Sequence, residues 1–119
     1  MLRLQGRGPV LIIEREVRLY VTPEGKIPYN DWFYSLRDGK AVHVIRARLA
    51  RLRAGNWGDY KSAGEGVLEL RIDFGPGYRI YCGMDGHKII ILLCGGDKHS
   101  QDKDIRKALN HWADYKRRR

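Results

Sequence analysis

Three short runs of residues in the second half of the chain, joined by two tight turns, constrain the fold most strongly. In the first run, 67–74, apolar side chains occupy every second position and charged side chains lie between them. This alternation is typical of a strand that is covered by a core on one side. Gly75-Pro76-Gly77 and Asp85-Gly86 are strong turn signals. Together they predict an antiparallel meander, with further strands at 78–84 and 87–94.

The first turn predicts which residues of the meander lie opposite one another. If Gly75-Pro76-Gly77 forms a three-residue turn, Phe74 faces Tyr78 and Arg79 faces Asp73. All the polar members of this hairpin then share one face of the sheet. They are Glu69, Arg71, Asp73, Arg79 and Tyr81.

The second turn predicts that Met84 faces His87, as expected of a two-residue hairpin loop. In this register the same isoleucines face the core in both hairpins, namely Ile72, Ile80 and Ile91. The run 89–94 is apolar on both faces, which predicts a central strand. An alternating run at 10–21 is the expected neighbour of that strand.

Two helices are expected before the meander and one after it. Asn30 or Asp31 is placed to begin a short helix, and a second helix with an apolar stripe spans about 40–54. Residues 55–66 contain four glycines and no hydrophobic period, so we expect a loop there. Ser100 is placed to begin the last helix.

These elements predict a single α+β domain over residues 1–119. In this fold an N-terminal helical hairpin packs on a mainly antiparallel sheet, and a C-terminal helix follows. Residues 1–9 are expected to form a flexible basic arm. A chain of 119 residues is long enough for one core but not for two.

The charge of the chain favours an anionic partner. Lys and Arg number 23 against 14 Asp and Glu, which gives a net charge of +9, so nucleic acid is the first candidate and an acidic protein the second. We expect no signal peptide, and no stretch approaches the ~20 apolar residues of a membrane span. A cytoplasmic protein without membrane contact is therefore expected. Cys82 and Cys94 are expected to be core thiols, and the Cys and His spacing predicts no metal or cofactor.

The arginines of the second helix allow three interpretations. They fall mostly off its apolar stripe, at Arg46, Arg48, Arg51 and Arg53. They could contact nucleic acid, dock an acidic partner, or form an ordinary solvated helix face.

The charged face of the meander is a candidate site for cutting RNA. The loop Asp97–His99 is expected to emerge beside Arg79, which would gather cations, an imidazole, a phenol and carboxylates. A base would take the proton of the ribose 2′-hydroxyl, cations would stabilise the phosphate, and an acid would protonate the leaving 5′-oxygen. An imidazole titrates near neutral pH, so His99 suits proton transfer. Arg71 and Arg79 suit the phosphate, and Lys98 suits either role. The alternative is an ordinary ion pair between Arg79 and Asp73 beside a polar loop.

Two segments carry a family resemblance. They are Glu69–Tyr81, with the pattern LRI…GYRIY, and Gly95–Ala108, with GGDK…QDKDI; the helix pair at 32–54 also fits. In these segments the chain resembles the toxins of bacterial toxin–antitoxin pairs of the RelE/HigB type, in the group called addiction-module killer proteins. The resemblance covers roughly residues 30–115.

The resemblance implies a microbial-RNase-like fold and a metal-independent endoribonuclease that cuts mRNA, typically in the ribosomal A site, where it would also contact ribosomal RNA. It further implies a cognate antitoxin, often a helix-turn-helix protein. By position, Arg71, Arg79 and Lys98 match basic residues that such toxins use. Some relatives use a tyrosine in the region 100–104 as the base; this chain has none there, which leaves His99 or Tyr81.

Three further cations are candidate RNA contacts: Lys61, Arg46 and Arg53. Some relatives also carry a basic residue where this chain has Glu69. Toxins of the same fold attack DNA gyrase and cut no RNA, so a ParE-like gyrase inhibitor stays open as a function. A basic module that binds RNA or protein without catalysis stays open as well.

Overall fold

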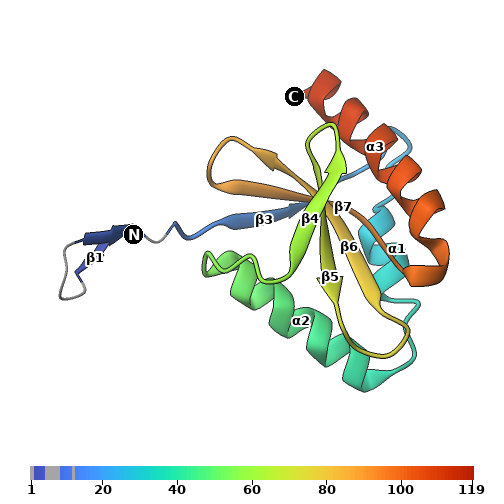
Figure 1. The fold of residues 1–119 in the computed structure, drawn as a ribbon. Coiled ribbons are helices and arrows are strands. Elements are labelled where there is room, and N and C mark those ends of the chain that lie inside the picture. The colour runs from blue at the N-terminus through green and yellow to red at the C-terminus, as the bar shows by residue number, and fades with distance from the viewer. Residues whose placement is uncertain (1, 5–8, 12) are drawn as a thin grey trace.

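The computed structural model describes residues 2–4, 9–11 and 13–119, and its centre is a sheet of five strands in the order β3-β7-β6-β5-β4 (Figure 1). β3 runs parallel to β7, and the other neighbours are antiparallel. The strands are β3 (Glu16–Leu19), β4 (Tyr60–Gly64), β5 (Val67–Ile72), β6 (Tyr78–Asp85) and β7 (Ile89–Asp97). The prediction that 89–94 belongs to a central strand beside the N-terminal one is confirmed.

Two short strands precede this sheet. β1 (Leu2–Leu4) and β2 (Pro9–Leu11) form a separate antiparallel pair. The rest of the basic arm expected over residues 1–9 lies outside the described residues.

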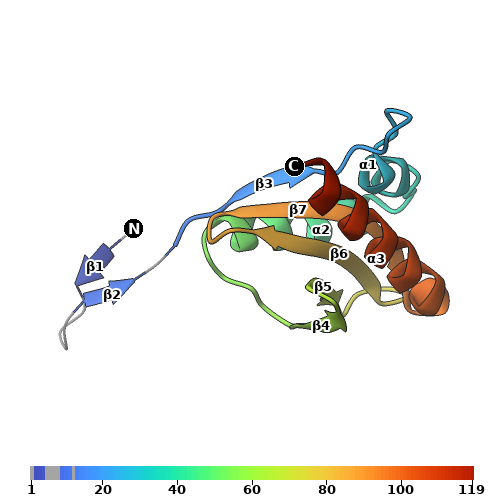
Figure 2. The same cartoon turned by 90° about the horizontal axis from the view of Figure 1, so that it is seen from above.

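Helices cover both faces of the sheet, as Figure 2 shows from above. α1 (Pro28–Phe33) and α2 (Gly39–Arg53) pack on one face, and α3 (Gln101–Arg118) packs on the other. A single 3-10 turn, η1 (Lys98–Ser100), links β7 to α3. The predicted α+β class is confirmed. No helix among the described residues is long and apolar enough to cross a membrane.

Two core clusters, one on each face, hold these layers together. Ile45 and Leu49 of α2 pack against Leu70 and Ile80 on one face. On the other face, Trp112 of α3 packs with side chains that include Val67, Tyr81, Ile91 and Leu93. The face that carries the polar residues of the meander is therefore covered, and Glu69 and Tyr81 are both fully buried. Cys82 and Cys94 are free thiols that belong to different clusters.

The predicted register of the first hairpin is wrong by two residues. Ile72, and not Phe74, lies opposite Tyr78, and Arg79 lies opposite Arg71 instead of Asp73. The loop is longer than three residues because Phe74 bonds back to Ile72 through its amide, at 3.0 Å, and so leaves the ladder. A shift of two residues preserves which side chains share a face.

The predicted register of the second hairpin is wrong by three residues. Asp85 pairs with Ile89, which leaves three residues in the loop, and a bulge follows between Tyr81 and Cys82. A shift by an odd number reverses the faces of the strand. Ile91 therefore packs on the α3 side, in a different cluster from Ile72 and Ile80.

Two segments that precede the meander also differ from the prediction. Residues 60–64 were expected to lie in a loop because they show no strand pattern. They form β4, which pairs with β5 at one edge of the sheet. α1 begins at Pro28, and neither Asn30 nor Asp31 caps it. Proline is favoured in the first turn of a helix because its fixed φ suits the helix and its missing N–H costs no hydrogen bond there.

Candidate functional site

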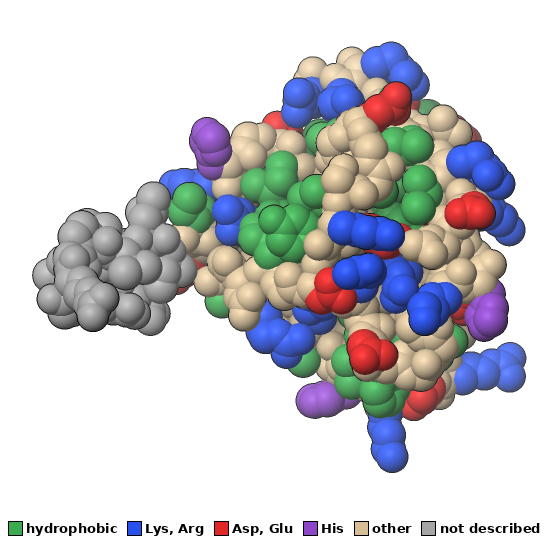
Figure 3. All heavy atoms as spheres, viewed as in Figure 1, with side chains coloured by type: hydrophobic (Ala, Val, Ile, Leu, Met, Phe, Trp, Pro, Cys, Tyr) green, Lys and Arg blue, Asp and Glu red, His purple; other side chains and the backbone are tan. Residues whose placement is uncertain are grey.

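A hollow of about 320 Å³ opens where β5, β6 and η1 meet. Six residues line it: Asp59, Arg71, Asp73, Gly77, Arg79 and Lys98. We call it the basic hollow, since three cations face two carboxylates in it. The face of the molecule drawn in Figure 3 likewise has basic and acidic side chains next to one another.

Three different elements bring the cations of the basic hollow together. Arg71 on β5 lies directly opposite Arg79 on β6. Lys98 begins η1, immediately after β7, and its backbone N–H donates to the carbonyl of Gly77 at 3.1 Å. Gly77 has a φ of 82°, and a Cβ there would lie 3.0 Å from Cδ of Lys98. Only glycine therefore fits this position without strain.

Arg71 is held by the carboxylate of Asp59. Its guanidinium donates to Oδ1 of Asp59 at 2.8 and 3.2 Å. This hydrogen bond lowers the pKa of Asp59 and raises the pKa of Arg71. The Arg71 side chain is still 38% exposed, so the guanidinium can also meet an anion that enters the hollow.

A buried carboxylate lies beneath the basic hollow. Glu69 is 0% exposed, and its Oε2 accepts hydrogen bonds from Tyr81 at 3.0 Å and from Gln101 at 2.9 Å. Its other oxygen lies 3.8 Å from Nζ of Lys61 and 4.0 Å from Nε of Arg79. Neither that oxygen nor Nε of Arg79 has a hydrogen-bond partner among the described residues. Two cations thus share one buried charge.

Arg79 is the least exposed cation of the basic hollow. Its side chain is 9% exposed, and Nη1 donates to the carbonyl of Tyr78 at 3.0 Å. The packing around the guanidinium and the charge of Glu69 hold it in one place. A cation fixed in this way is ready to receive a phosphate oxygen with little reorganisation.

The structure thus brings together three of the predicted site residues, Arg71, Arg79 and Lys98, but not the other two. Tyr81 lies inside the protein, where burial and its hydrogen bond to Glu69 raise the pKa of the phenol. His99 is exposed and lines a neighbouring hollow with the first turns of α3. Lys98 lines both hollows.

The three predicted RNA contacts lie outside the basic hollow. Lys61 is on β4, beside Glu69. Arg46 and Arg53 line a groove between α1 and α2 instead. A fourth arginine of α2, Arg48, is buried; its guanidinium donates to three backbone carbonyls, including that of Trp57 at 2.8 Å. Arg48 therefore has a structural role that its position off the apolar stripe did not predict.

Two residues of the basic hollow were not predicted to belong to it. Asp59 lies in the segment expected to be a loop, and a strand pairing that the sequence does not reveal brings it to Arg71. Gly77 shows only a turn signal in the sequence. Its close contact with Lys98 becomes evident only when η1 folds against the hairpin.

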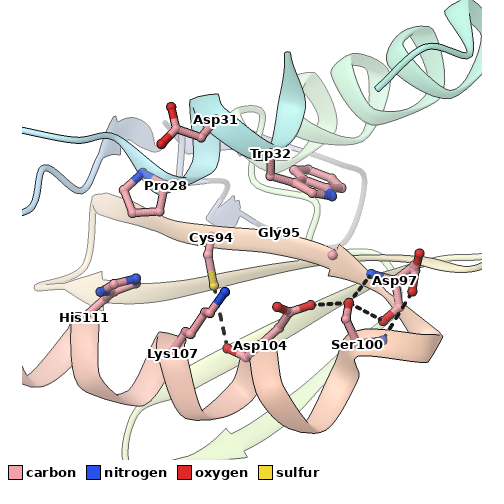
Figure 4. Close-up of a pocket in the computed structure, with 11 residues that line it drawn as sticks. Pro28, Asp31, Trp32, Cys94, Gly95, Asp97, Ser100, Asp104, Lys107 and His111 are labelled. Carbon is pink, nitrogen blue, oxygen red and sulfur yellow. Dashed lines mark hydrogen bonds between the residues drawn. The ribbon is translucent and has the colours of Figure 1, made fainter. Parts of the chain in front are cut away.

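A second cavity, of about 460 Å³, lies between α1, the end of β7 and α3. In Figure 4, Trp32 of α1 stands over Gly95, and Asp104 and Lys107 of α3 approach from the opposite side. A Cβ on Gly95 would lie 2.2 Å from the Trp32 ring, and one on Gly96 would lie 1.8 Å from the Asp104 carboxylate. The two glycines of the GGDK pattern therefore serve packing.

Other polar residues of the GGDK…QDKDI element also have structural roles. Ser100 occupies the N-cap position of α3, as predicted, but its side chain makes no capping hydrogen bond there. Asp97 caps η1 instead, since its carboxylate accepts from the backbone N–H of His99 at 2.8 Å and of Ser100 at 3.3 Å. The Ser100 hydroxyl donates to Asp104. Burial raises the pKa of Cys94 in the second cavity to about 12, which favours the protonated thiol at neutral pH.

The basic hollow can hold an oxyanion but offers few metal ligands. No group of three or more His, Cys, Asp or Glu side chains among residues 2–4, 9–11 and 13–119 could hold a metal ion. Two guanidinium groups and an ammonium group suit a phosphate, which accepts several charge-assisted hydrogen bonds.

Comparison with known proteins finds similarity over most of the residues that form this fold. A family model described as "Phage derived protein Gp49-like (DUF891)" matches residues 31–113, which include all three cations of the basic hollow. The chain is also similar to an uncharacterized protein of Haemophilus influenzae, with 48% identity over 82 residues, or 69% of this chain and 83% of the relative. The chain therefore belongs to the Gp49-like family, a phage-derived, toxin-like family that is associated with addiction modules.

Proposed function

We propose that this chain is the RelE/HigB-type toxin of a toxin–antitoxin pair and that it cuts mRNA on the ribosome without a metal ion. The observation that carries this proposal is the convergence of Arg71, Arg79 and Lys98 on one hollow. Membership of a toxin-like family supports the toxin role. The net charge of +9 suits an RNA partner.

In the proposed reaction, the ribose 2′-oxygen attacks the adjacent phosphorus and the bond from phosphorus to the 5′-oxygen breaks. A base takes the 2′-hydroxyl proton, and an acid gives a proton to the leaving oxygen. The products would be a 2′,3′-cyclic phosphate and a 5′-hydroxyl. Arg79 and Arg71 would stabilise the charge that gathers on the phosphate oxygens.

We assign the proton transfers to the two consecutive residues at the start of η1. His99 would act as the base and Lys98 as the acid, since Lys98 lines the basic hollow and His99 follows it in the chain. Tyr81 is unsuited to proton transfer with RNA because its hydroxyl is buried against Glu69. Lys61 would contact RNA beside the hollow.

The toxin proposal includes three partners. A cognate antitoxin, which we expect to be a helix-turn-helix protein, would neutralise the toxin. The mRNA and the ribosomal RNA of the A site would be the nucleic-acid partners. The exposed cations around the hollow, which include Lys98 and Lys61, suit phosphate backbones.

A gyrase-inhibiting toxin is the second candidate function. One observation favours it: among the described residues that line the basic hollow there is no histidine or tyrosine. Such a hollow can bind an anion, but none of these lining residues is a histidine or tyrosine that could take a proton from RNA. The two functions differ in what happens to mRNA, which makes them separable by experiment.

Induced expression in bacteria tests both. The ribonuclease proposal predicts growth arrest, rescue by a neighbouring antitoxin gene, and new mRNA 5′ ends that primer extension can map. Arg79→Ala and Lys98→Ala should abolish the growth arrest and the new 5′ ends, whereas Lys88→Ala, which changes an exposed lysine that does not line the hollow, should abolish neither. Growth arrest with intact mRNA and a DNA-damage response would instead support the gyrase function. Normal growth would support a basic module without catalysis.

A further inference from the structure

The groove between α1 and α2 is a second basic surface that the RNA-cutting reaction does not use. It has a volume of about 310 Å³. Three aromatic residues, one leucine and two arginines make most of its lining: Tyr29, Phe33, Tyr34, Leu49, Arg46 and Arg53. We call it the α1–α2 groove.

The charge of this groove is of one sign. No acidic residue lines it among the described residues, whereas Asp59 and Asp73 lie among the cations of the basic hollow. Arg46 and Arg53 are both exposed, and both act on the Tyr29 phenol, since their charges oppose the rise in its pKa that burial causes. Tyr29, Arg46 and Arg53 all line this one groove.

The hydroxyl of Tyr29 is unpaired within the part of the chain that the structure describes. Tyr29 is 4% exposed, and its oxygen is buried without any partner among the described residues. A buried polar group that lacks a partner is uncommon because it loses its bonds to water and gains none. The long Arg46 and Arg53 side chains beside it can shift to admit an acceptor.

The aromatic rings of the groove are largely engaged with one another. Tyr29 and Phe33 are stacked, with centroids 5.8 Å apart, and the Arg46 guanidinium lies over the Phe33 ring at 5.2 Å. Proteins that bind single-stranded RNA offer open aromatic faces to the bases. Only Tyr34, which is 72% exposed, offers one here, so the groove is a poor stacking platform.

We propose that the α1–α2 groove binds an acidic segment of a protein partner. A carboxylate of that segment accepts hydrogen bonds from Arg53, Arg46 and the Tyr29 hydroxyl, and an apolar neighbour of that carboxylate covers Leu49 and Tyr34. Arginine and tyrosine are the residue types that most often dominate protein interfaces. The groove is separate from the basic hollow, so this inference does not depend on RNA cleavage.

Selection from a library of random peptides displayed on phage tests the proposal with the full-length chain. Peptides are selected on the wild type and depleted on the double variant Tyr29→Phe/Arg53→Gln. The selected sequences should carry Asp or Glu next to an apolar residue. Each should bind the single variants about tenfold more weakly, as expected for the loss of one hydrogen bond to a charged group. Arg51→Gln, which removes an exposed arginine of α2 outside the groove, should bind normally.

Tyr29→Phe also separates binding from a structural role. The free protein should be at least as stable with phenylalanine, because the change removes an unpaired polar atom and keeps the ring. Peptides without a carboxylate, or peptides that bind wild type and variants equally, would overturn the proposal. Displacement of the selected peptides by a single-stranded RNA that loses affinity in the same variants would also overturn it, in favour of an RNA site.

Discussion

At the scale of single residues, Glu69 is the group on which the basic hollow most depends. Its carboxylate is fully buried, and its Oε1 lies 4.0 Å from Nε of Arg79. Tyr81 and Gln101 hold the carboxylate in place through its other oxygen. Glu69 does not reach the surface, so it acts on a substrate only through the position of Arg79.

Glu69→Gln should therefore weaken both stability and activity. Replacing the charge leaves the buried Arg79 guanidinium without its counterion, which should cost about 1–3 kcal/mol of unfolding free energy. Cleavage should fall about tenfold or more as Arg79 loses its fixed position. Urea unfolding and mRNA cleavage assays measure the two effects. Glu24→Gln, at an exposed turn, is the control, and equal behaviour of the two variants would refute the role of Glu69.

Gly77 is the second residue that shapes the hollow, and Gly86 offers a matched control. Both have positive φ, at 82° and 72°, but a Cβ on Gly77 would press on Lys98 whereas one on Gly86 meets nothing within 4 Å. Alanine at either position should cost about 1–2 kcal/mol of stability from backbone strain. Only Gly77→Ala should also reduce phosphate binding, measured by calorimetry. Equal phosphate affinity in the two variants would show that Lys98 does not need this close packing.

At the scale of elements, α3 decides which face of the sheet is accessible. It covers Glu69 and Tyr81, and its C-terminal half is tied to the residue that follows β3 through a hydrogen bond of 2.6 Å from Tyr20 to Asp114. That hydrogen bond is the main cause of the lowered pKa of Asp114. We therefore expect the attachment of α3 to weaken in acid.

The expected pH dependence follows from the direction of that shift. Since the pKa of Asp114 is lower in the folded than in the unfolded protein, its contribution to stability is complete above about pH 4 and disappears as the pH falls through the folded-state pKa. Tyr20→Phe should remove most of this contribution at neutral pH and change little at about pH 2. Thermal unfolding across this range measures it. A constant difference from wild type at all pH values would argue against the linkage, and Tyr60→Phe, at an exposed tyrosine, is the control.

The sequence predicts the elements better than it predicts their pairing. The three strands of the meander, α2 and α3 are evident from periodicity. β4 is not, because its residues, YKSAG, show no alternation of apolar and polar side chains. The faces of β7 are not predictable either, since a strand apolar on both sides fits its neighbours equally well after a shift of one residue. The length of the loop between β6 and β7 decides which face each side chain of β7 joins. The Asp85-Gly86 signal does not reveal that this loop extends to Lys88.

The same reasoning explains what could be predicted of the candidate site. Arg71 and Arg79 are correctly placed on one face because an error of two residues in register preserves the faces. Lys98 is correctly placed because it follows the strand that ends beside Gly77. The burial of Tyr81 was not predictable, since no sequence pattern shows that α3 packs on the polar face.

At the scale of the whole molecule, the positive charge is divided between surfaces that different elements make. The basic hollow mixes cations with carboxylates and suits a single phosphate group. The α1–α2 groove has two arginines, three aromatic residues, Asn30 and Leu49 in its lining, with no carboxylate among the described residues, and it suits an acidic protein segment. A toxin of a toxin–antitoxin pair needs two surfaces: one that acts on its target and one that binds the partner that neutralises it. Keeping the two surfaces separate would let each be altered by mutation without loss of the other.

In the proposed reaction, the basic hollow cleaves RNA through the ribose 2′-hydroxyl. Adding the purified chain to ribosomes that carry a defined mRNA, and then identifying the new ends, tests it most directly. We predict 5′-hydroxyl and 2′,3′-cyclic phosphate ends with the wild type and with Lys88→Ala, and uncut mRNA with Lys98→Ala. Fragments with 5′-phosphate ends, or equal cleavage by Lys98→Ala, would contradict the account.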